Sequence, residues 1–164
     1  MNGSRVYLLA AIVAGCATPG AAPVAAKTQA KAAAPAARPS TAELVAARQA
    51  GMHMAATLFA KGIAPRAKGE GDLKDTPWSE GLEMWAAAIP GLFPPGSADP
   101  KSRAKPEIWT SKADFDAKAH AMGEAAARVT AAGKAGDLAA YSAAAGQLTN
   151  ACKACHTTYR AEQR

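Results

Sequence analysis

Two cysteines and a histidine stand close together near the end of the 164-residue chain. Cys152 and Cys155 are separated by two residues, and His156 follows the second cysteine directly. Thiols and an imidazole at this spacing can perform three kinds of chemistry: thiol–disulfide exchange, binding of a zinc ion, or covalent attachment of a haem whose iron the histidine ligates. The rest of the chain has to decide between these three.

The surroundings of this motif favour haem attachment. A thiol–disulfide active site follows a strand and opens a helix in a βαβ unit, and no strand pattern precedes Cys152. A zinc site needs four ligands, and only His53 and His120 could add nitrogen ligands to the motif. Two thiols one helical turn apart can instead bond the two vinyl groups of one haem, with His156 directed at the iron. We therefore predict one covalently bound haem c.

The N-terminal residues have the features of an export signal. Arg5 precedes the apolar run Val6–Ala14, which is too short to span a bilayer because a transmembrane helix needs about 20 residues. The run leads into Val-Ala-Gly-Cys, which resembles the lipobox of bacterial lipoproteins. We expect residues 1–15 to be a lipoprotein-type signal peptide and Cys16 to carry a lipid on the periplasmic side. Ala17 is not the aspartate that commonly retains lipoproteins at the inner membrane, which favours the outer membrane; a soluble periplasmic protein is the alternative.

Residues 16–40 are predicted to be a tether. Alanine dominates them, and prolines at positions 19, 23, 35 and 39 interrupt any helix that the alanines could start. Residues 1–40 also hold four of the basic side chains and no acidic one, so the net charge of +6 falls to +2 from Thr41 onward, where 15 Lys and Arg face 13 Asp and Glu. Binding to nucleic acid needs a clustered basic excess, so nucleic acid is not an expected partner.

From Thr41 onward, apolar residues recur with the period of an α-helix, and no segment alternates with the period of a strand. Ser40 or Thr41 can cap the first helix, which we expect to stop near Lys61 because of Gly62 and Pro65. Together the pattern predicts four helices: about 41–61, 75–89, from about 112 to the glycines at 133 and 136, and from 137 to beyond residue 155. Residues 41–164 are therefore predicted to form an all-α, antiparallel four-helix bundle.

The composition predicts a thin core for this bundle. Hydrophobic residues make up 49% of the chain, but alanine supplies many of them and aromatic residues only 5%. A covalently bound haem is a large apolar disc, and we expect it to fill the space that the small side chains leave between the helices.

Four stretches of the chain carry a resemblance to a known family. They are RQAGM (Arg48–Met52), IPGLFPPGS (Ile89–Ser97), KPEIW (Lys105–Trp109) and the end of the chain from Gly136 through CKACHTTYR. Together they resemble the class II c-type cytochromes, the cytochrome c′ family, from about residue 41 to the end of the chain. The methionine at position 52 resembles the low-spin, methionine-ligated members.

The resemblance implies roles for individual residues. Cys152 and Cys155 would form the thioethers, and His156 would be the proximal iron ligand. The residues implied near the haem propionates are Arg48 and Gln49 on the first helix and Lys105 with Arg103 in the loop, although Lys105 replaces the arginine that is usual in the family. Arg160, four residues after the histidine, would lie beside the proximal imidazole.

The first helix carries the residue on which the function depends. On a helical wheel of about 100° per residue, Met52 shares a face with Arg48 and Phe59, whereas His53 and Met54 lie about 100° and about 200° away. The resemblance implies that this face turns to the distal side of the haem. We therefore expect Met52 to be the distal axial ligand, and we expect His53, Met54 and also His120 not to bind iron.

Two functions follow from the two possible states of Met52. If its sulfur binds iron, the site is six-coordinate and suits electron transfer, which is the function that we favour from the sequence. If it only packs over the iron, the site is five-coordinate and binds small gases such as nitric oxide and carbon monoxide, in nitric oxide protection. No distal histidine–arginine pair is placed to cleave an O–O bond, so we do not expect an enzyme.

The expected partners are redox proteins, which the sequence does not identify, and a membrane reached through the lipid on Cys16. The family resemblance also allows a homodimer through the first two helices, with Met54 and Leu58 on the contact face.

Overall fold

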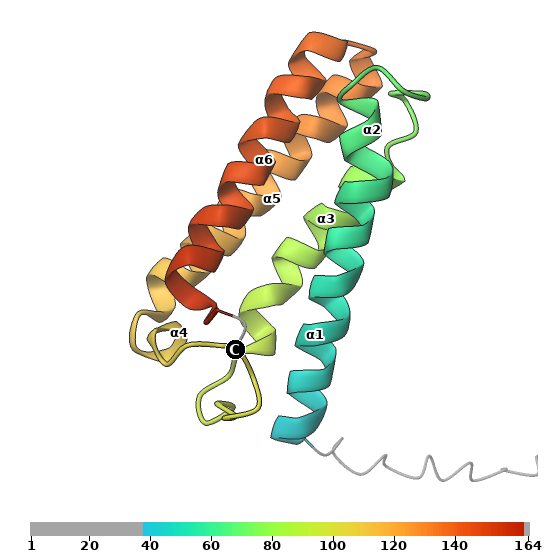
Figure 1. Cartoon of the computed structure of the whole chain (residues 1–164). Coiled ribbons are helices and arrows are strands. Elements are labelled where there is room, and N and C mark those ends of the chain that lie inside the picture. Colours follow the sequence, from blue (N-terminus) through green and yellow to red (C-terminus); the bar gives the residue numbers. More distant parts are fainter. Residues whose placement is uncertain (1–37, 163–164) are drawn as a thin grey trace, which may run out of the picture. The chain divides into compact units, whose positions relative to one another are not determined.

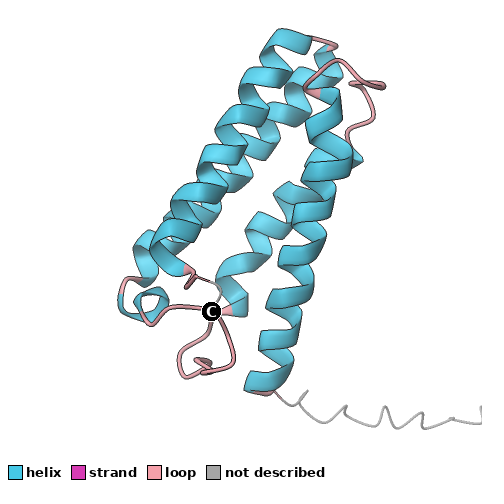
Figure 2. Cartoon of the chain, in the orientation of Figure 1, coloured by secondary structure: helices cyan, strands magenta, loops and turns pink. Residues whose placement is uncertain are grey.

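The computed structural model describes residues 38–162, and these residues fold into helices (Figures 1 and 2). No β-strand occurs in this part of the chain; it contains only a single antiparallel bridge between Ala104 and Arg160. The elements in chain order are α1 (Thr41–Thr57), the π-helix η1 (Leu58–Ile63), α2 (Ala64–Arg66), α3 (Pro77–Ala88), the 3₁₀-helix η2 (Ile89–Leu92), α4 (Glu107–Thr110), α5 (Lys112–Ala135) and α6 (Leu138–Tyr159). The predicted signal peptide, Cys16 and most of the tether lie outside the described residues.

The four predicted helices are present. α1, η1 and α2 form one continuous helix; α3 with η2, α5 and α6 are the other three. α5 packs against both α3 and α6, and α1 packs on α3 and η2 (Figure 1). The prediction of an all-α, antiparallel four-helix bundle is therefore confirmed. None of the helices in residues 38–162 combines the length and the apolar character needed to cross a membrane.

The helix starts follow from local capping. Ser40 Oγ accepts a hydrogen bond from the backbone of Glu43 (3.3 Å), and the Glu43 carboxylate accepts one from the backbone of Ser40 (2.7 Å). This capping box begins α1 and lowers the pKa of Glu43. Asp137 caps α6 by accepting a hydrogen bond from the backbone of Ala140 (2.9 Å). Gly136, at φ 70°, makes the tight turn between α5 and α6 in the left-handed conformation that glycine adopts without strain.

The first helix does not stop where the sequence predicts. It continues past Gly62 and Pro65 to Arg66, because η1 has the wider turn of a π-helix, in which the backbone N–H of Ala64 bonds to Phe59 O. The wider turn leaves room for the proline ring, which would clash with a carbonyl group in a regular α-helix. Arg66 Nη1 then donates to Gly62 O (2.9 Å), so this carbonyl group keeps a partner.

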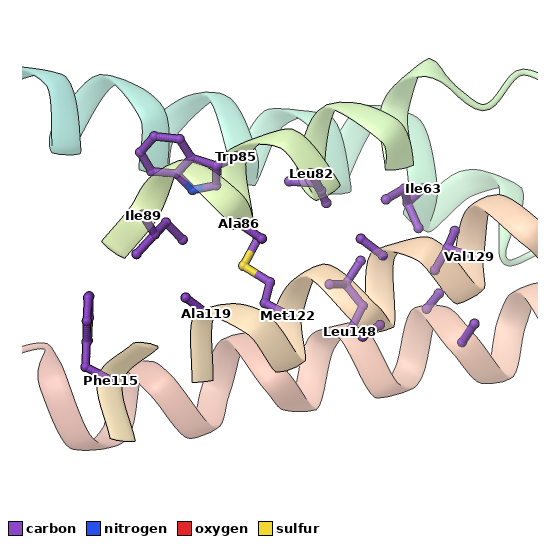
Figure 3. Close-up of a cluster of buried hydrophobic side chains, with 14 of the residues drawn as sticks. Ile63, Leu82, Trp85, Ala86, Ile89, Phe115, Ala119, Met122, Val129 and Leu148 are labelled. Atoms are coloured by element: carbon purple, nitrogen blue, oxygen red, sulfur yellow. The ribbon is translucent and has the colours of Figure 1, made fainter. Parts of the chain in front are cut away.

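One hydrophobic core extends through the bundle, and its side chains toward the α5–α6 turn have almost no exposed surface. Ile63, Val129 and Leu148 are fully buried (Figure 3), and Tyr141 is buried in the same core. Small side chains on α5 and α6 are buried around them, which lets these two helices pack closely; they are Ala125, Ala126, Ala144 and Ala145. We call the end with the α5–α6 turn the filled end. The opposite end, with the start of α1 and the end of α6, is called the open end.

Candidate haem site

A cavity of ≈620 Å³ lies between the helices at the open end. Its walls come from α1, α3, α5 and α6 and from the loop before α4. Most of the lining side chains are apolar, among them Phe59, Ile89, Phe115 and Met122. A cavity of this size lies within the range of about 300–1,000 Å³ that is usual for pockets that bind small molecules and cofactors.

Both motif cysteines face this cavity. Cys152 and Cys155 are free thiols, half-buried, and one turn apart on α6. Burial raises the pKa of each thiol. A thiol–disulfide active site needs the opposite shift, because the thiolate is the nucleophile. The two side chains are therefore placed and protonated as attachment points rather than as a redox pair.

His156 lines the same cavity and is half-buried. Burial, followed by the positive charges of Arg160 and Arg103, lowers the pKa of its imidazole. A lowered pKa leaves the imidazole neutral at pH 7, with a free lone pair on one nitrogen. Neutral imidazole is the form that binds a metal, so the local charge prepares His156 for the role of an iron ligand.

Met52 also lines the cavity, and it is half-buried against the core. Gln49 and His53 line its rim and are exposed. Met54 is 49% exposed and lies outside the cavity, as does the exposed His120. The structure thus brings Met52 and the motif on α6 to one cavity, in agreement with the helical wheel. Whether Met52 binds iron stays a prediction.

Arg48 is the most constrained charged side chain at the open end. It is 4% exposed, and its Nε donates to Leu92 O (2.7 Å). Its two terminal nitrogens donate to Ser97 O (2.9 Å) and to Ser97 Oγ. The guanidinium carbon lies 4.2 Å from the centre of the Phe93 ring and 5.8 Å from that of Trp109. Burial lowers the pKa of Arg48. Arg48 therefore holds the loop after η2 against α1, beside the cavity that it lines.

The two basic residues predicted from the loop have different positions. Arg103 lines the cavity, and its Nε donates to Ala161 O (2.9 Å). Lys105 does not line the cavity. Its ammonium group donates to Thr157 O (3.3 Å) and Thr158 O (3.2 Å), because the last carbonyl groups of α6 attract a cation. The structure therefore places the Lys105 ammonium group at the end of α6, and a contact with a haem propionate stays a prediction.

Arg160 follows α6 in an extended conformation and lines the cavity. Its backbone forms the bridge to Ala104, and Lys105 N donates to Tyr159 O (3.0 Å) beside it. This short pairing fastens the loop to the end of α6. It keeps the charge of Arg160 near His156, where it contributes to the lowered pKa.

Tyr159 and Lys118 are among the cavity residues that were not predicted from the sequence. Tyr159 is buried, and its hydroxyl donates to Asp114 Oδ2 (2.6 Å). Burial, followed by Asp114, raises the pKa of Tyr159 to about 12. Lys118 lines the cavity from α5 and lies 3.5 Å from Asp114. The spacing of Tyr159 three residues after His156 could have placed it on the motif's face of the helix.

The charges around the cavity have one sign. Among the described residues that line it there is no aspartate or glutamate, whereas the basic ones are Arg48, Arg103, Lys118, Lys153 and Arg160. A cavity with this lining suits a molecule that has a large apolar body and acidic groups at its edge.

Comparison with known proteins identifies the family. The family model described as Cytochrome C' matches residues 43–160. A cytochrome c′ of Alcaligenes xylosoxydans xylosoxydans is 33% identical over 116 residues, which is 69% of this chain and 89% of the relative. The chain belongs to the cytochrome c′ family.

Other relatives match over shorter stretches. Cytochrome c-556 of Agrobacterium tumefaciens is 45% identical over 75 residues, 46% of this chain and 60% of the relative. Cytochrome c-554 of Cereibacter sphaeroides is 45% identical over 83 residues, 48% of this chain and 54% of the relative. The chain thus spans a little over half the length of these two relatives.

Solved structures of cytochrome c′ have the same fold. The nitric oxide complex of a mutant cytochrome c′ from Alcaligenes xylosoxidans matches with a TM-score of 0.70 and 30% identity, over 77% of this chain and all of the other. A carbon monoxide-bound variant of the cytochrome c′ from the same organism matches with a TM-score of 0.66 and 29% identity, over 75% and 98% of the two chains.

Cytochrome c′ proteins carry one covalently bound haem c, and the residues of this chain fit that cofactor. Cys152, Cys155 and His156 would hold it from α6, since all three face one cavity of suitable size and lining. The zinc alternative has no support, because no group of three potential ligands occurs within residues 38–162. The thiol–disulfide alternative lacks the strand that it needs in the same part of the chain.

Proposed function

We propose that this cytochrome c′ binds nitric oxide and carbon monoxide reversibly in the cavity at the open end. The observation that carries the proposal is the apolar wall of the cavity on the side of α1 and α3, with Met52, Ala56 and Phe59 on α1 and η1 and with Leu82 and Ile89 on α3 and η2. These five side chains carry no hydrogen-bond donor, although Arg48, Gln49 and His53 of α1 also line the cavity. The Arg48 guanidinium is bonded to Leu92 and Ser97. An apolar stretch of this kind favours a small neutral gas over dioxygen, which gains more from a donor.

The relatives support gas binding better than the His/Met electron carrier that the sequence favoured. Two of the similar solved structures are complexes of a cytochrome c′ with nitric oxide and with carbon monoxide. In this chain, α1 packs on α3 and η2 and makes no comparable contact with α6, so the α1 wall stands apart from the motif helix. This arrangement leaves the volume between them to a cofactor and a small ligand.

The protein's own residues would prepare this binding. When attached, haem c supplies an iron atom to which a gas can bind. The neutral His156 is available as the proximal ligand, because burial and the neighbouring arginines keep it unprotonated. The small side chains of Ala55 and Ala56 in the apolar wall leave space for a diatomic molecule.

The test is titration of the reduced, exported holoprotein with carbon monoxide, followed by absorption. We expect saturable binding of one carbon monoxide per haem. A reduced spectrum that does not change at saturating carbon monoxide would contradict gas binding.

Electron transfer is the second candidate, and the specific observation in its favour is the thioether of Met52 in the same cavity. A sulfur ligand would close the sixth position and stabilise the ferrous state. In that case the oxidised protein has a low-spin spectrum with a sulfur-to-iron charge-transfer band, and Met52→Leu removes this band. A high-spin spectrum that Met52→Leu leaves unchanged would exclude this candidate.

We also propose a periplasmic location, since haem attachment to such a motif takes place outside the cytoplasm in bacteria. The lipid on Cys16, the outer membrane and unidentified redox partners remain proposals, because Cys16 lies outside the described residues. The lipid anchor is tested by exporting wild type and Cys16→Ser and extracting each protein with and without detergent. We expect detergent to be needed only for wild type, and release of both proteins without detergent would refute the anchor.

A homodimer is likewise a prediction. Met54 and Met84 are exposed on α1 and α3, whereas Leu58 is partly buried and packs against the core. Ultracentrifugation of Met54→Lys beside wild type would test it.

A further inference from the structure

Two tryptophans of α3 each lie against a glycine of the first helix. A Cβ atom on Gly51 would stand 2.1 Å from Trp85 Cη2, and one on Gly62 would stand 2.3 Å from Trp78 Cγ. Both distances are far below van der Waals contact. Glycine inside a helix lowers stability by roughly 1 kcal/mol relative to alanine. The close approach of the ring explains glycine at these two positions, because any larger residue would clash with the tryptophan.

The two contacts differ in what lies next to them. Gly51 precedes Met52 directly and follows Arg48 by three residues, and both of these side chains line the cavity. Gly62 precedes Ile63, which is fully buried at the filled end and takes no part in the cavity. A displacement of the helix at Gly51 therefore moves Met52 directly, whereas the cavity residue nearest to Gly62 is Phe59, three residues earlier in the chain.

The two rings are also held differently. Trp78 Nε1 donates to Asp75 Oδ2 (2.8 Å), and the guanidinium carbon of Arg66 lies 5.5 Å from the ring centre. Trp85 is 7% exposed, and its buried Nε1 has no hydrogen-bond partner in the described structure. A buried hydrogen-bond donor without a partner is unfavourable. The shape of the ring, and not its N–H group, therefore explains why a tryptophan is found at position 85. Trp85 itself does not line the cavity; Figure 3 shows it in the core beside Ile89.

We infer that Trp85 is a positioning residue for Met52. Its outer ring rests on Gly51 and fixes the separation of α1 from α3, and this separation sets how far the Met52 side chain reaches into the cavity. The ring thereby sets the affinity for a gas in the cavity. The inference rests on the proposed function, because its first test measures the affinity for a gas. Its second test measures the absorption spectrum of the protein and needs only the haem of the family.

The test compares two glycine substitutions in the exported holoprotein. Gly51→Ala pushes α1 away from α3 and withdraws Met52, so we expect the affinity for carbon monoxide to rise by about three- to thirtyfold, the range for displacements within a packed network. Gly62→Ala adds the same methyl group against a tryptophan at the filled end, and we expect an affinity within about twofold of wild type. An unchanged or lowered affinity in Gly51→Ala, or an equal rise in Gly62→Ala, overturns the inference.

A second variant covers the case in which Gly51→Ala folds poorly. Trp85→Phe lacks the outer ring atoms that contact Gly51 and gives up no hydrogen bond. The double variant Gly51→Ala with Trp85→Phe has room for the new methyl group, and we expect its affinity to return to within about twofold of wild type. A double variant that keeps the full change of Gly51→Ala contradicts a role for the ring.

The outcomes also separate this inference from the proposed function. If wild type does not bind carbon monoxide, gas binding fails, and the positioning role is then measured by the absorption spectrum of the oxidised protein. Gly51→Ala must weaken the band that Met52→Leu removes, and Gly62→Ala must leave it intact. An identical spectrum in all the glycine variants overturns the positioning role.

Discussion

The filled end and the open end of the bundle are built from the same helices but differ in how their side chains pack. At the filled end, Ile63, Val129 and Leu148 leave no exposed surface and meet alanines on the facing helices. At the open end, the same helices diverge around a cavity of ≈620 Å³ that carries thiols, an imidazole and basic groups. The difference shows that this fold separates stability from chemistry along its length, because tightly packed side chains at one end allow a cavity beside the core at the other.

The largest expected effect concerns the open end alone. Replacing Cys152 and Cys155 together by serine removes both attachment points, and we expect complete loss of covalently bound haem while the helices of the filled end still form. Haem staining after denaturing electrophoresis and far-ultraviolet circular dichroism measure the two results. Cys16→Ser is the control and should keep its haem; haem that stays covalently bound to the double variant would contradict the assignment.

The next prediction compares one residue type at the two ends. Ile63→Ala truncates a side chain with 0% exposure at the filled end, so we expect a loss of about 2–5 kcal/mol in unfolding free energy. Its haem spectrum should not change. Ile89→Ala truncates a cavity side chain, and we expect a changed spectrum. Denaturant unfolding measures the change in stability, and absorption spectra of both variants measure the change at the haem. A spectrum altered by Ile63→Ala would contradict the separate roles of the two ends.

A smaller effect is expected where the loop after η2 closes the open end. Arg48→Met leaves Leu92 O and Ser97 O without their donors, which should cost about 1–3 kcal/mol of unfolding free energy. Lys112→Met is the control, since it removes a partly exposed ion pair with Asp116 and a cation–π contact with Phe115 but no buried hydrogen bond. Denaturant unfolding measures the free energy of unfolding of both variants. An equal loss in the two would show that the buried guanidinium of Arg48 does not stabilise the fold.

The smallest effect appears only at alkaline pH. The pKa of Tyr159 is raised to about 12, above its ordinary value of about 10, so folding is favoured while the hydroxyl stays protonated. This contribution is complete below about pH 10 and is lost as the pH rises toward about 12. We expect the unfolding free energy of wild type to fall more steeply over this range than that of Tyr159→Phe. Parallel curves would refute the raised pKa.

Much of the fold could be predicted from the sequence because its signals are local. Ser40 with Glu43 and Asp137 mark helix starts that the structure confirms, and the apolar spacing gives the right number of helices. The end of the first helix was wrong, because the π-turn at η1 accommodates Pro65, and nothing in the local sequence announces that turn.

The candidate site was predictable where its residues share a helix. Cys152, Cys155 and His156 lie on one face of α6, and Met52 lies on the face of α1 that the helical wheel selects. Lys105 could not be placed in this way, since its partners are carbonyl groups more than fifty residues away.

The sequence by itself determined the cofactor chemistry, the helical class and the family, because each rests on short spacings along a helix. The tertiary structure alone decided which end of the bundle is hollow and that Arg48 holds a loop. It also decided that Trp85 rests on Gly51 beside Met52. These facts depend on how closely two helices approach, and that distance is set by side chains far apart in the chain.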